Sequence, residues 1–517
     1  MRWIALHLPL LSLESFAATL PHGPGEPGEP GDRPLALMDA QSILAVNAAA
    51  RALGVKPGFR RATALALAPQ LVLGQVDRVR DAQALSAVAH VALAFTPGVS
   101  IQPPGDSTPD DVPHTVLLEV QASLRYFGGL SALLQRLRDA LAPLGHRVHV
   151  VSAATALGAA LLARVHTRLH CADLAATCEA LDRAPAWLLG PGRAHWETLQ
   201  GMGLRTIADL RGVPRAGLAR RVGERVLGEI DRARGTRPDP REPLALSPAF
   251  DSRLELFARA DTTAQLMHGA AVLLARLVAW LSAQHAFVRR FTLLMEHEQR
   301  SRRDAAGAAV TALELALAEP SRDAAHLLVL LRERLAPLQL PAPTLDLRLC
   351  AADIARRAPP NAELFPTPAS EHEGLTRLIE RLQARLGREQ VLRLVPCRDH
   401  RPERATVARI ADAALRPVRA CSTAGGAALA LHAVRPVWLL QRPEPLHGRN
   451  QAPLLDGQPL QLLSGPERIE SGWWDAGLVA RDYFIAQLPG GALVWVYRSR
   501  VPVAAAQSCW FLQGRFG

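Results

Sequence analysis

One group of side chains has the residue types of a zinc site: His166, His170, Cys171 and Cys178. Imidazoles and thiolates are ligands that zinc prefers, and the histidine pair has the i, i+4 spacing of one helical face. The intervals nevertheless fit no standard zinc pattern. The pairs His297-Glu298 and His372-Glu373 also lack the second histidine of an HExxH metalloprotease helix. We therefore expect no metal site and no bound cofactor.

Phosphate chemistry is restricted by the single lysine of the chain, Lys56, which leaves arginine to supply almost all of the 59 basic residues. A nucleotide-binding loop of the GxxxxGK[ST] type needs a Gly-Lys pair, whereas Lys56 stands in Gly-Val-Lys-Pro-Gly. This excludes a Walker-type NTPase. The net charge of +11 and the planar donor fork of arginine suit phosphate contacts, although codon bias on a solvated surface gives the same composition.

Residues 199–210 have the form of a helix-hairpin-helix turn that contacts DNA phosphates. The glycines Gly201 and Gly203 permit a tight hairpin, and the N–H groups around Arg205 and Thr206 would face a phosphate at a helix N-terminus. Such a contact reads no base sequence. The alternative is a glycine-rich turn between helices without any ligand.

The length of the chain and its cysteine spacing indicate the number of domains and the cellular compartment. A chain of 517 residues is long enough for three to five domains. Its six cysteines are scattered without a CxxC pair, as in a reducing cytosol, and no apolar run is long enough to cross a membrane. The first residues imitate a signal peptide, but His7, Pro9 and Glu14 interrupt the apolar stretch. We expect a buried strand there and a cytoplasmic, nucleoid-associated protein.

The elements that position these residues fall into successive domains. Short strand-like runs at 3–8, 115–120 and 148–152 predict an α/β domain over residues 1–180. Residues 182–242, which contain the hairpin, predict short helices. Residues 252–354 alternate two amphipathic helices with four strands in the order βαββαβ.

The C-terminal third differs from these domains in composition. We expect residues 355–397 to form a linker with one short helix near 375–386. Residues 398–517 contain five of the nine tryptophans in alternating valine and aromatic runs, which predict a small β-rich module.

This order of parts resembles the Y-family translesion DNA polymerases, with a palm and fingers (fingers about 22–90), a thumb and a little finger. Two segments carry the resemblance. Residues 50–58 (Ala-Arg-Ala-Leu-Gly-Val-Lys-Pro-Gly) are similar to the fingers motif, and residues 117–129 (Leu-Leu-Glu-Val-Gln-Ala-Ser-Leu-Arg-Tyr-Phe-Gly-Gly) are similar to a palm strand and turn. The resemblance covers roughly residues 1–350 and implies the same fold.

The resemblance also implies positions for the carboxylates that hold two Mg²⁺ ions in these polymerases. In the first palm strand those positions fall at His7 and Pro9, and in the second motif at His114 and Thr115. None of these residues offers the carboxylate that hard Mg²⁺ prefers. In the fingers, Ala48 replaces a stacking tyrosine while Arg51 is kept. The resemblance therefore points to a polymerase body without its metal site.

Such a body with an extra C-terminal module resembles the ImuB family, the non-catalytic subunits of a bacterial mutagenesis cassette. The segments that match are 400–403 (His-Arg-Pro-Glu), 463–475, 480–484 and the ending 510–514. The family implies an adaptor that binds the replication sliding clamp and DNA and recruits ImuA and an error-prone C-family polymerase.

Two groups of residues are candidates for these partner contacts. The clamp-binding peptide would be Asn361-Ala362-Glu363-Leu364-Phe365, with its last two residues as apolar anchors, and its alternative is an ordinary loop. Trp473 and Trp474, with Arg481 and Asp482, are candidates for a partner surface, and the tryptophans are otherwise core of the module.

Two other functions stay open at this point. The first is an active but divergent Y-family polymerase that holds metal with Asp110, Asp111 or Glu119. The second is a DNA-repair protein that uses the hairpin and its arginine-rich faces without a polymerase partner.

Overall fold

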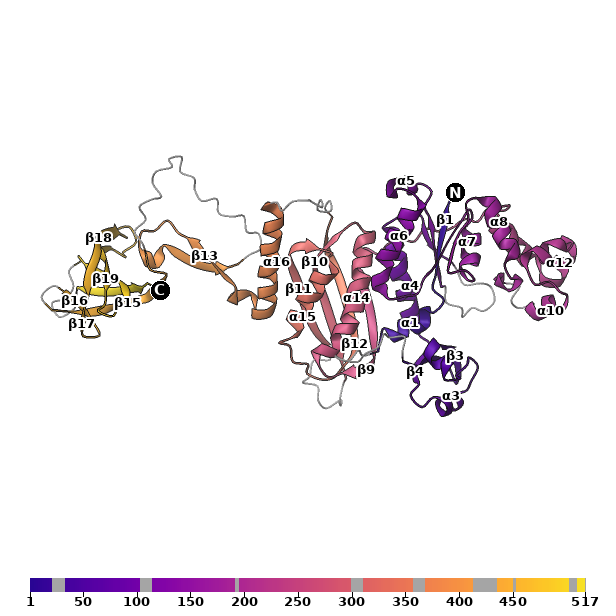
Figure 1. Cartoon of the computed structure of the whole chain (residues 1–517), viewed down its shortest axis with the longest axis horizontal. Coiled ribbons are helices and arrows are strands. Elements are labelled where there is room, and N and C mark those ends of the chain that lie inside the picture. The colour runs from indigo at the N-terminus through magenta and orange to yellow at the C-terminus, as the bar shows by residue number, and fades with distance from the viewer. Residues whose placement is uncertain are drawn as a thin grey trace. The chain divides into compact units, whose positions relative to one another are not determined.

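In the computed structural model the chain forms two compact units, residues 1–385 and residues 386–517 (Figure 1). The structure describes residues 1–20, 33–102, 114–190, 195–298, 310–356, 368–411, 435–449, 452–501 and 509–516.

A five-stranded sheet forms the centre of the N-terminal α/β domain. Its strand order is β5 (Val99–Ile101), β6 (Thr115–Glu119), β1 (Trp3–His7), β7 (His149–Ala153), β8 (Arg168–His170). Side chains alternate across β1 as they must in a strand, so that Ile4 and Leu6 pack with α4 (Arg78–Leu93) and α6 (Leu130–Leu141), and Ala5 packs with α7 (Ala156–Ala163). The buried strand predicted near the N-terminus is confirmed.

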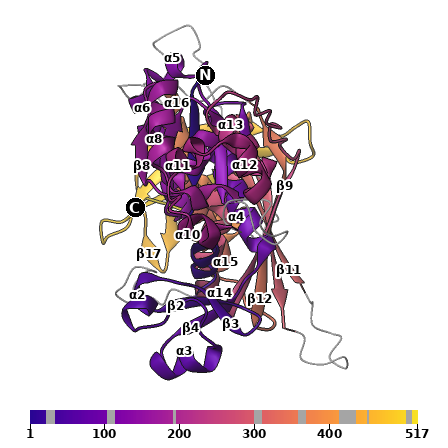
Figure 2. The same cartoon turned by 90° about the vertical axis from the view of Figure 1, so that its right-hand side faces the viewer.

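A smaller three-stranded sheet lies where fingers are expected. Its order is β3 (Ser42–Val46), β2 (Leu35–Asp39), β4 (Val72–Gln75), and the short helices α2 (Ala48–Ala52) and α3 (Arg61–Leu67) accompany it (Figure 2). Helix α1 (Leu11–Ala17) connects β1 to this region, and its Phe16 packs with Leu35 and Leu37 of β2.

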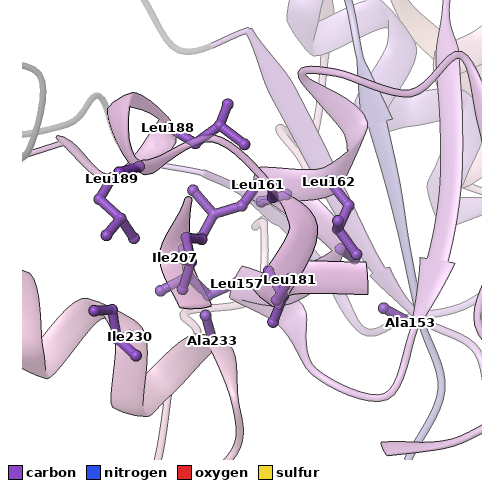
Figure 3. Packing of buried hydrophobic residues seen from close by; sticks show 14 of the residues in the cluster. Ala153, Leu157, Leu161, Leu162, Leu181, Leu188, Leu189, Ile207, Ile230 and Ala233 are labelled. Carbon is purple, nitrogen blue, oxygen red and sulfur yellow. The ribbon is translucent and has the colours of Figure 1, made fainter. Parts of the chain in front are cut away.

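Helix α7 joins the large sheet to a cluster of short helices because it is apolar on every side and buried along its whole length. Its partners are α8 (Leu174–Arg183), α10 (Trp196–Gly201), α11 (Ile207–Gly212), α12 (Arg215–Val222) and α13 (Glu224–Ala233). Figure 3 shows Leu157 and Leu161 of α7 within the same cluster as Leu181, Ile207 and Ile230 of these helices.

The predicted βαββαβ order is confirmed. The strands β9 (Phe250–Ala260), β10 (Phe287–His297), β11 (Val310–Ser321) and β12 (Thr344–Ala355) form a sheet of order β11-β10-β12-β9, with α14 (Thr263–Ala283) and α15 (Ala324–Leu335) packed on it. By length and composition α14 could cross a membrane, with a mean hydropathy of 1.6, but 61% of that window is buried inside the protein. Its apolar character is therefore explained by core packing.

Contacts from the βαββαβ domain reach back to the first domain through α4 and α14. Arg276 of α14 is buried and donates from one nitrogen to Gln83 Oε1 of α4 at 3.2 Å, to Ser252 Oγ at 3.2 Å and to the Arg253 carbonyl. The Gln83 side chain also accepts the Arg253 N–H at 3.3 Å. A buried guanidinium without a carboxylate partner has a lowered pKa, here to about 10, mainly because burial disfavours its charge.

The segment expected to be a linker contains a longer helix than the sequence indicated. Helix α16 (Pro368–Leu386) has 19 residues, and its Ile379 is buried. Its Ala384 packs against the core of the βαββαβ domain. The extension covers residues 368–374, which begin with Pro368 and contain Glu371 and Glu373, and these residue types favour the start of a helix.

The second unit is rich in β-structure, as predicted. After a ribbon of β13 (Leu392–Pro396) and β14 (Thr406–Ile410), it contains a seven-stranded sheet. The sheet order is β17 (Gln458–Pro459), β16 (Ala452–Leu455), β15 (Trp438–Arg449), β21 (Trp510–Arg515), β20 (Leu493–Ser499), β19 (Val479–Gln487), β18 (Gln461–Ser471). The finer domain boundaries inside both units stay predictions.

Candidate functional site

The residues expected at the acidic positions of the palm meet at one end of the large sheet. His7 of β1 stands opposite Thr115 of β6 in the ladder, and His7 Nδ1 lies 2.9 Å from Thr115 Oγ1 in a hydrogen bond. His114 precedes Thr115 and donates from Nδ1 to the Leu8 carbonyl at 3.1 Å. The alignment by sequence and the strand register therefore agree on which residues share this corner.

A third histidine and an arginine complete the corner. His149 of β7 pairs with His7 on the other side, with ring centroids 5.9 Å apart, and donates from Nδ1 to the Ala163 carbonyl. Arg164, which follows α7, donates to the Leu188 carbonyl at 2.9 Å and lies over the Trp187 ring. Its positive charge acts on His7. The corner therefore holds imidazoles and a fixed cation.

The surroundings keep His7 uncharged at neutral pH. Burial is the largest cause that lowers the pKa of His7 to about 3, and the charges of His114, Arg164 and His149 lower it further.

A cavity of about 860 Å³ lies beside this corner. Pro9, at the second acidic position of the first strand, lines it together with Ala48 and Arg51 of α2 and with His149. Its walls are mainly apolar, and its basic groups outnumber its single carboxylate, Glu14. The Glu14 carboxylate accepts a hydrogen bond from the Arg147 backbone N–H at 3.0 Å, and this bond partly satisfies the carboxylate.

Glu119, one of the carboxylates of the active-polymerase alternative, does not lie at this corner. Glu119 pairs with Trp3, whereas Thr115 pairs with His7, which places Glu119 four residues along the strand, about 13 Å away. Asp110 and Asp111 lie outside the described residues. Among the residues that are described, no group of three His, Cys, Asp or Glu side chains is placed to hold a metal ion, and this includes His166, His170, Cys171 and Cys178.

The predicted helix-hairpin-helix turn is formed by α10 and α11, with Gly203 at a φ of +79° that favours glycine. Its N–H groups are already bonded within the turn or to the neighbouring helix. Asp209 Oδ2 accepts the N–H groups of Arg205 and Thr206 at 2.9 and 2.8 Å, and the N–H groups of Met202, Gly203, Leu204 and Ile207 donate to carbonyls.

The backbone contact to phosphate predicted for Gly201, Gly203, Arg205 and Thr206 therefore lacks its N–H donors in this structure. The physical reason is the capping box between Thr206 and Asp209, which satisfies the start of α11 from inside. What remains for a phosphate is the exposed side chain of Arg205, whose charge also acts on the neighbouring carboxylate of Asp209. DNA contact at the hairpin stays a prediction.

The open face of the βαββαβ sheet carries arginines that are already paired with carboxylates across strands. Arg348 of β12 forms a bidentate ion pair with Asp251 of β9. Arg253 forms an ion pair with Asp346 at an N···O distance of 2.5 Å, and Arg290 forms one with Glu314 at 3.0 Å. Paired arginines contribute less positive field, so this face is poorly suited to phosphate binding.

The tryptophan pair of the second unit is exposed and not core. Trp473 and Trp474, between β18 and β19, are 72% and 57% exposed, and their rings meet edge to face at 4.6 Å. The turn below them is fixed because Asp475 accepts hydrogen bonds from Arg401 at 2.9 and 2.6 Å and from Arg404 at 2.7 Å. These bonds hold the pKa of Asp475 near 2. The two indoles are thus presented on an ordered support.

Arg481 and Asp482, predicted beside them, have partners inside the unit. Arg481 bonds Glu403 at 3.0 Å and the Tyr483 hydroxyl at 3.0 Å. Asp482 is buried and accepts from Arg468 Nε at 2.8 Å. Their side chains hold β19 to its neighbours, so the partner contact expected of them is not supported by their positions.

One predicted segment lies outside the described residues, and one residue of the site was not predicted. The peptide Asn361-Ala362-Glu363-Leu364-Phe365 lies outside the described residues, between the ends of β12 and α16. Arg164 was missed as part of the palm corner, since 157 positions separate it from His7 and no local pattern marks it. The pattern Thr206-x-x-Asp209, by contrast, was a readable sign that the hairpin caps itself.

The buried imidazole predicts a pH effect on stability. In the unfolded chain His7 binds a proton below about pH 6.5, but in the folded chain only near pH 3. Stability is therefore lost as pH falls through this window, by at most about 1.4 kcal/mol per pH unit from this group. We expect His7→Gln to lose less stability than the wild type between pH 6.5 and 4, as measured by urea unfolding. Parallel pH profiles for the two proteins would contradict the buried, neutral imidazole.

Comparison with known proteins gives a family match and full-length relatives. Residues 29–164 match the model of the impB/mucB/samB family. Protein ImuB of Caulobacter vibrioides, from two strains, is 29% identical over 488 residues, which cover 90% of this chain and 100% of the relative.

Solved structures that match part of the chain include a Dbh ternary complex, with a TM-score of 0.37 at 15% identity; the match covers 68% of this chain and 99% of the other. DinB from Sulfolobus solfataricus matches the same shares with a TM-score of 0.36 at 15% identity.

The matched residues 29–164 cover the small sheet and, at the palm corner, Thr115, His149 and Arg164 but not His7 or Pro9. The observed order of elements continues through the hairpin helices and the βαββαβ sheet. The Y-family-like fold class with a β-rich C-terminal module is therefore confirmed. The chain is a homologue of the ImuB proteins and contains an impB/mucB/samB family domain.

Proposed function

We propose that the chain is a non-catalytic Y-family polymerase homologue. It acts as a cytoplasmic adaptor that binds the sliding clamp and recruits ImuA and an error-prone C-family polymerase for translesion synthesis after DNA damage. The observation that carries this proposal is the hydrogen-bonded His7–Thr115 pair at the palm corner, where the family resemblance expects metal-binding carboxylates.

The chemistry of this pair argues against Mg²⁺-dependent nucleotide transfer. Mg²⁺ requires oxygen ligands in near-octahedral geometry and is usually held by carboxylates. The corner offers one hydroxyl, which is already bonded to His7, and Pro9 adds no ligand at all. The guanidinium of Arg164 adds electrostatic repulsion. The active-polymerase alternative would depend on Asp110 and Asp111, because Glu119 is too far along β6.

Clamp binding is proposed for residues 361–365. The segment follows β12 and precedes α16, so both of its ends attach to the βαββαβ domain. Leu364 and Phe365 would enter an apolar pocket of the clamp, as extended peptides with paired apolar anchors do. Asn361 departs from the glutamine that usually begins such peptides, which would reduce affinity.

Recruitment of ImuA and of the polymerase is proposed for the second unit. The two exposed indoles, Trp473 and Trp474, form a rigid apolar projection of the kind that anchors protein interfaces. The Arg401–Asp475–Arg404 network orders the projection before binding and so reduces the entropy lost on association.

DNA contact is proposed for the hairpin through the charge of Arg205. We expect Arg205→Ala to weaken binding of duplex DNA several-fold and to lower the slope of log K against log salt by about 1, since one phosphate contact is lost. Fluorescence anisotropy across a salt series measures both quantities. The control is Arg183→Ala on α8, which removes an arginine paired with Glu179. Equal effects of the two variants would remove the hairpin from the DNA interface.

The clamp peptide gives a second test. We expect the double variant Leu364→Ala, Phe365→Ala to lose at least ten-fold in affinity for the sliding clamp, because both apolar anchors are removed. Surface plasmon resonance on immobilised clamp measures the change. Leu67→Ala, which shortens an exposed leucine of α3, is the control. Unchanged clamp affinity in the double variant would show that another segment binds the clamp.

A further inference from the structure

The ribbon formed by β13 and β14 lies wholly within the second unit and has only two strands. The strands pair antiparallel from Leu392 opposite Ile410 to Pro396 opposite Thr406, and neither pairs with another described strand. We call this pair the β13–β14 ribbon. A strand at the edge of a sheet presents a row of unpaired N–H and C=O groups, and an isolated ribbon of two strands is only marginally stable in water. A third strand would therefore stabilise it.

The hydrogen-bond phase of the ribbon shows which groups of β14 point outward. The Ala411 N–H donates to the Val391 carbonyl at 2.9 Å, and the Cys397 N–H donates to the Ala405 carbonyl at 2.8 Å. Because bonded and non-bonded pairs alternate in an antiparallel ladder, the odd-numbered residues of β14 bond to β13. The N–H groups that point away from β13 are those of the even-numbered residues, Thr406, Ala408 and Ile410. All five residues of β14 are exposed, so this edge is open in the described structure.

The two faces of the ribbon differ in chemistry, because side chains alternate across each strand and opposed residues share a face. One face carries Leu392, Leu394 and Ile410, which are 53%, 75% and 39% exposed. The other face carries Arg393 opposite Arg409 and, beside them, Val395 opposite Val407. The ribbon is therefore apolar on one side and positively charged on the other.

Arg393 and Arg409 have no acidic partner among the described residues. Arg393 Nε is also shielded from water without a hydrogen-bond acceptor in the part of the chain that the structure describes. The acids between the two strands are bonded to other arginines, Asp399 to Arg401 and Glu403 to Arg481. Like charges directly opposite each other destabilise a strand pair, so a carboxylate brought to this face would be stabilising.

We propose that the outer edge of β14 takes up an extended segment of a partner protein as a third strand. Backbone hydrogen bonds would hold the segment, and its alternating side chains would select it. The fitting segment has apolar residues beside Ala408 and Ile410 on one face and a carboxylate beside Arg409 on the other. A second copy of β14 would instead bring another arginine to the charged face, which is unfavourable. This proposal goes beyond the recruitment surface given to the tryptophan pair and does not depend on it.

The test measures binding of short extended peptides to the full-length protein by fluorescence anisotropy. One peptide alternates valine and glutamate, and a second alternates valine and lysine. A third is the glutamate peptide with methyl groups on the backbone nitrogens of one edge. We expect the glutamate peptide to bind at least about ten-fold more tightly than either of the others, because lysine would meet Arg409 and N-methylation removes the strand hydrogen bonds.

Variants of β14 separate strand addition from other modes of binding. Ala408→Pro removes an outward N–H but no hydrogen bond of the ribbon, and proline is accepted at an edge position of this kind. We expect it to weaken binding of the glutamate peptide at least about ten-fold. Ala408→Ser keeps the N–H and is the matched control. Arg409→Glu should shift the preference from the glutamate peptide to the lysine peptide.

The proposal is wrong if no peptide binds, if the glutamate and lysine peptides bind equally, or if N-methylation has no effect. Equal loss in Ala408→Ser would assign the effect to a side-chain contact instead of the backbone edge. Self-association that disappears in Ala408→Pro would show that a second copy occupies the edge. Circular dichroism checks that the variants are folded, and the methylated peptide tests the edge even if Ala408→Pro does not fold. Unchanged peptide affinity in Trp473→Ala separates this site from the tryptophan surface.

Discussion

The hydrogen bond between His7 and Thr115 determines what the N-terminal domain can do. It joins the central strand β1 to its neighbour β6 at the sheet corner where the family resemblance expects carboxylates, and it engages the Thr115 hydroxyl. Burial and the nearby Arg164 lower the pKa of His7, so this imidazole is neutral at pH 7. The fold around it is otherwise intact, with a packed sheet, a helix α7 buried along its length and an ordered hairpin.

Besides the palm corner, the described residues form exposed surfaces at several places along the chain. The hairpin presents Arg205 while its own N–H groups are capped by Asp209. The βαββαβ sheet has its arginines paired with acids, whereas the β13–β14 ribbon presents Arg393 and Arg409 without such partners among the described residues. The second unit also presents two tryptophans on an ion-paired turn.

Much of this fold was predictable because its signals are local. The alternating strands and amphipathic helices of 252–354 gave the βαββαβ order, and strand 3–8 was recognised despite His7 and Pro9. Features set by tertiary contacts were not predictable, such as the closeness of Arg164 to His7 and the burial of Asp482 by Arg468. The exposure of Trp473 and Trp474 was undecidable from sequence, since aromatic residues serve equally in cores and interfaces.

The most direct test of the account is primer extension with the highly purified full-length protein, Mg²⁺ or Mn²⁺ and all four nucleotides, beside an active Y-family polymerase. The account predicts no incorporation by the wild-type protein under conditions in which it binds the primer-template. Incorporation that is lost in Asp110→Ala or Asp111→Ala variants would contradict it, because it would show that the loop before β6 supplies the metal ligands and that this chain is a working polymerase.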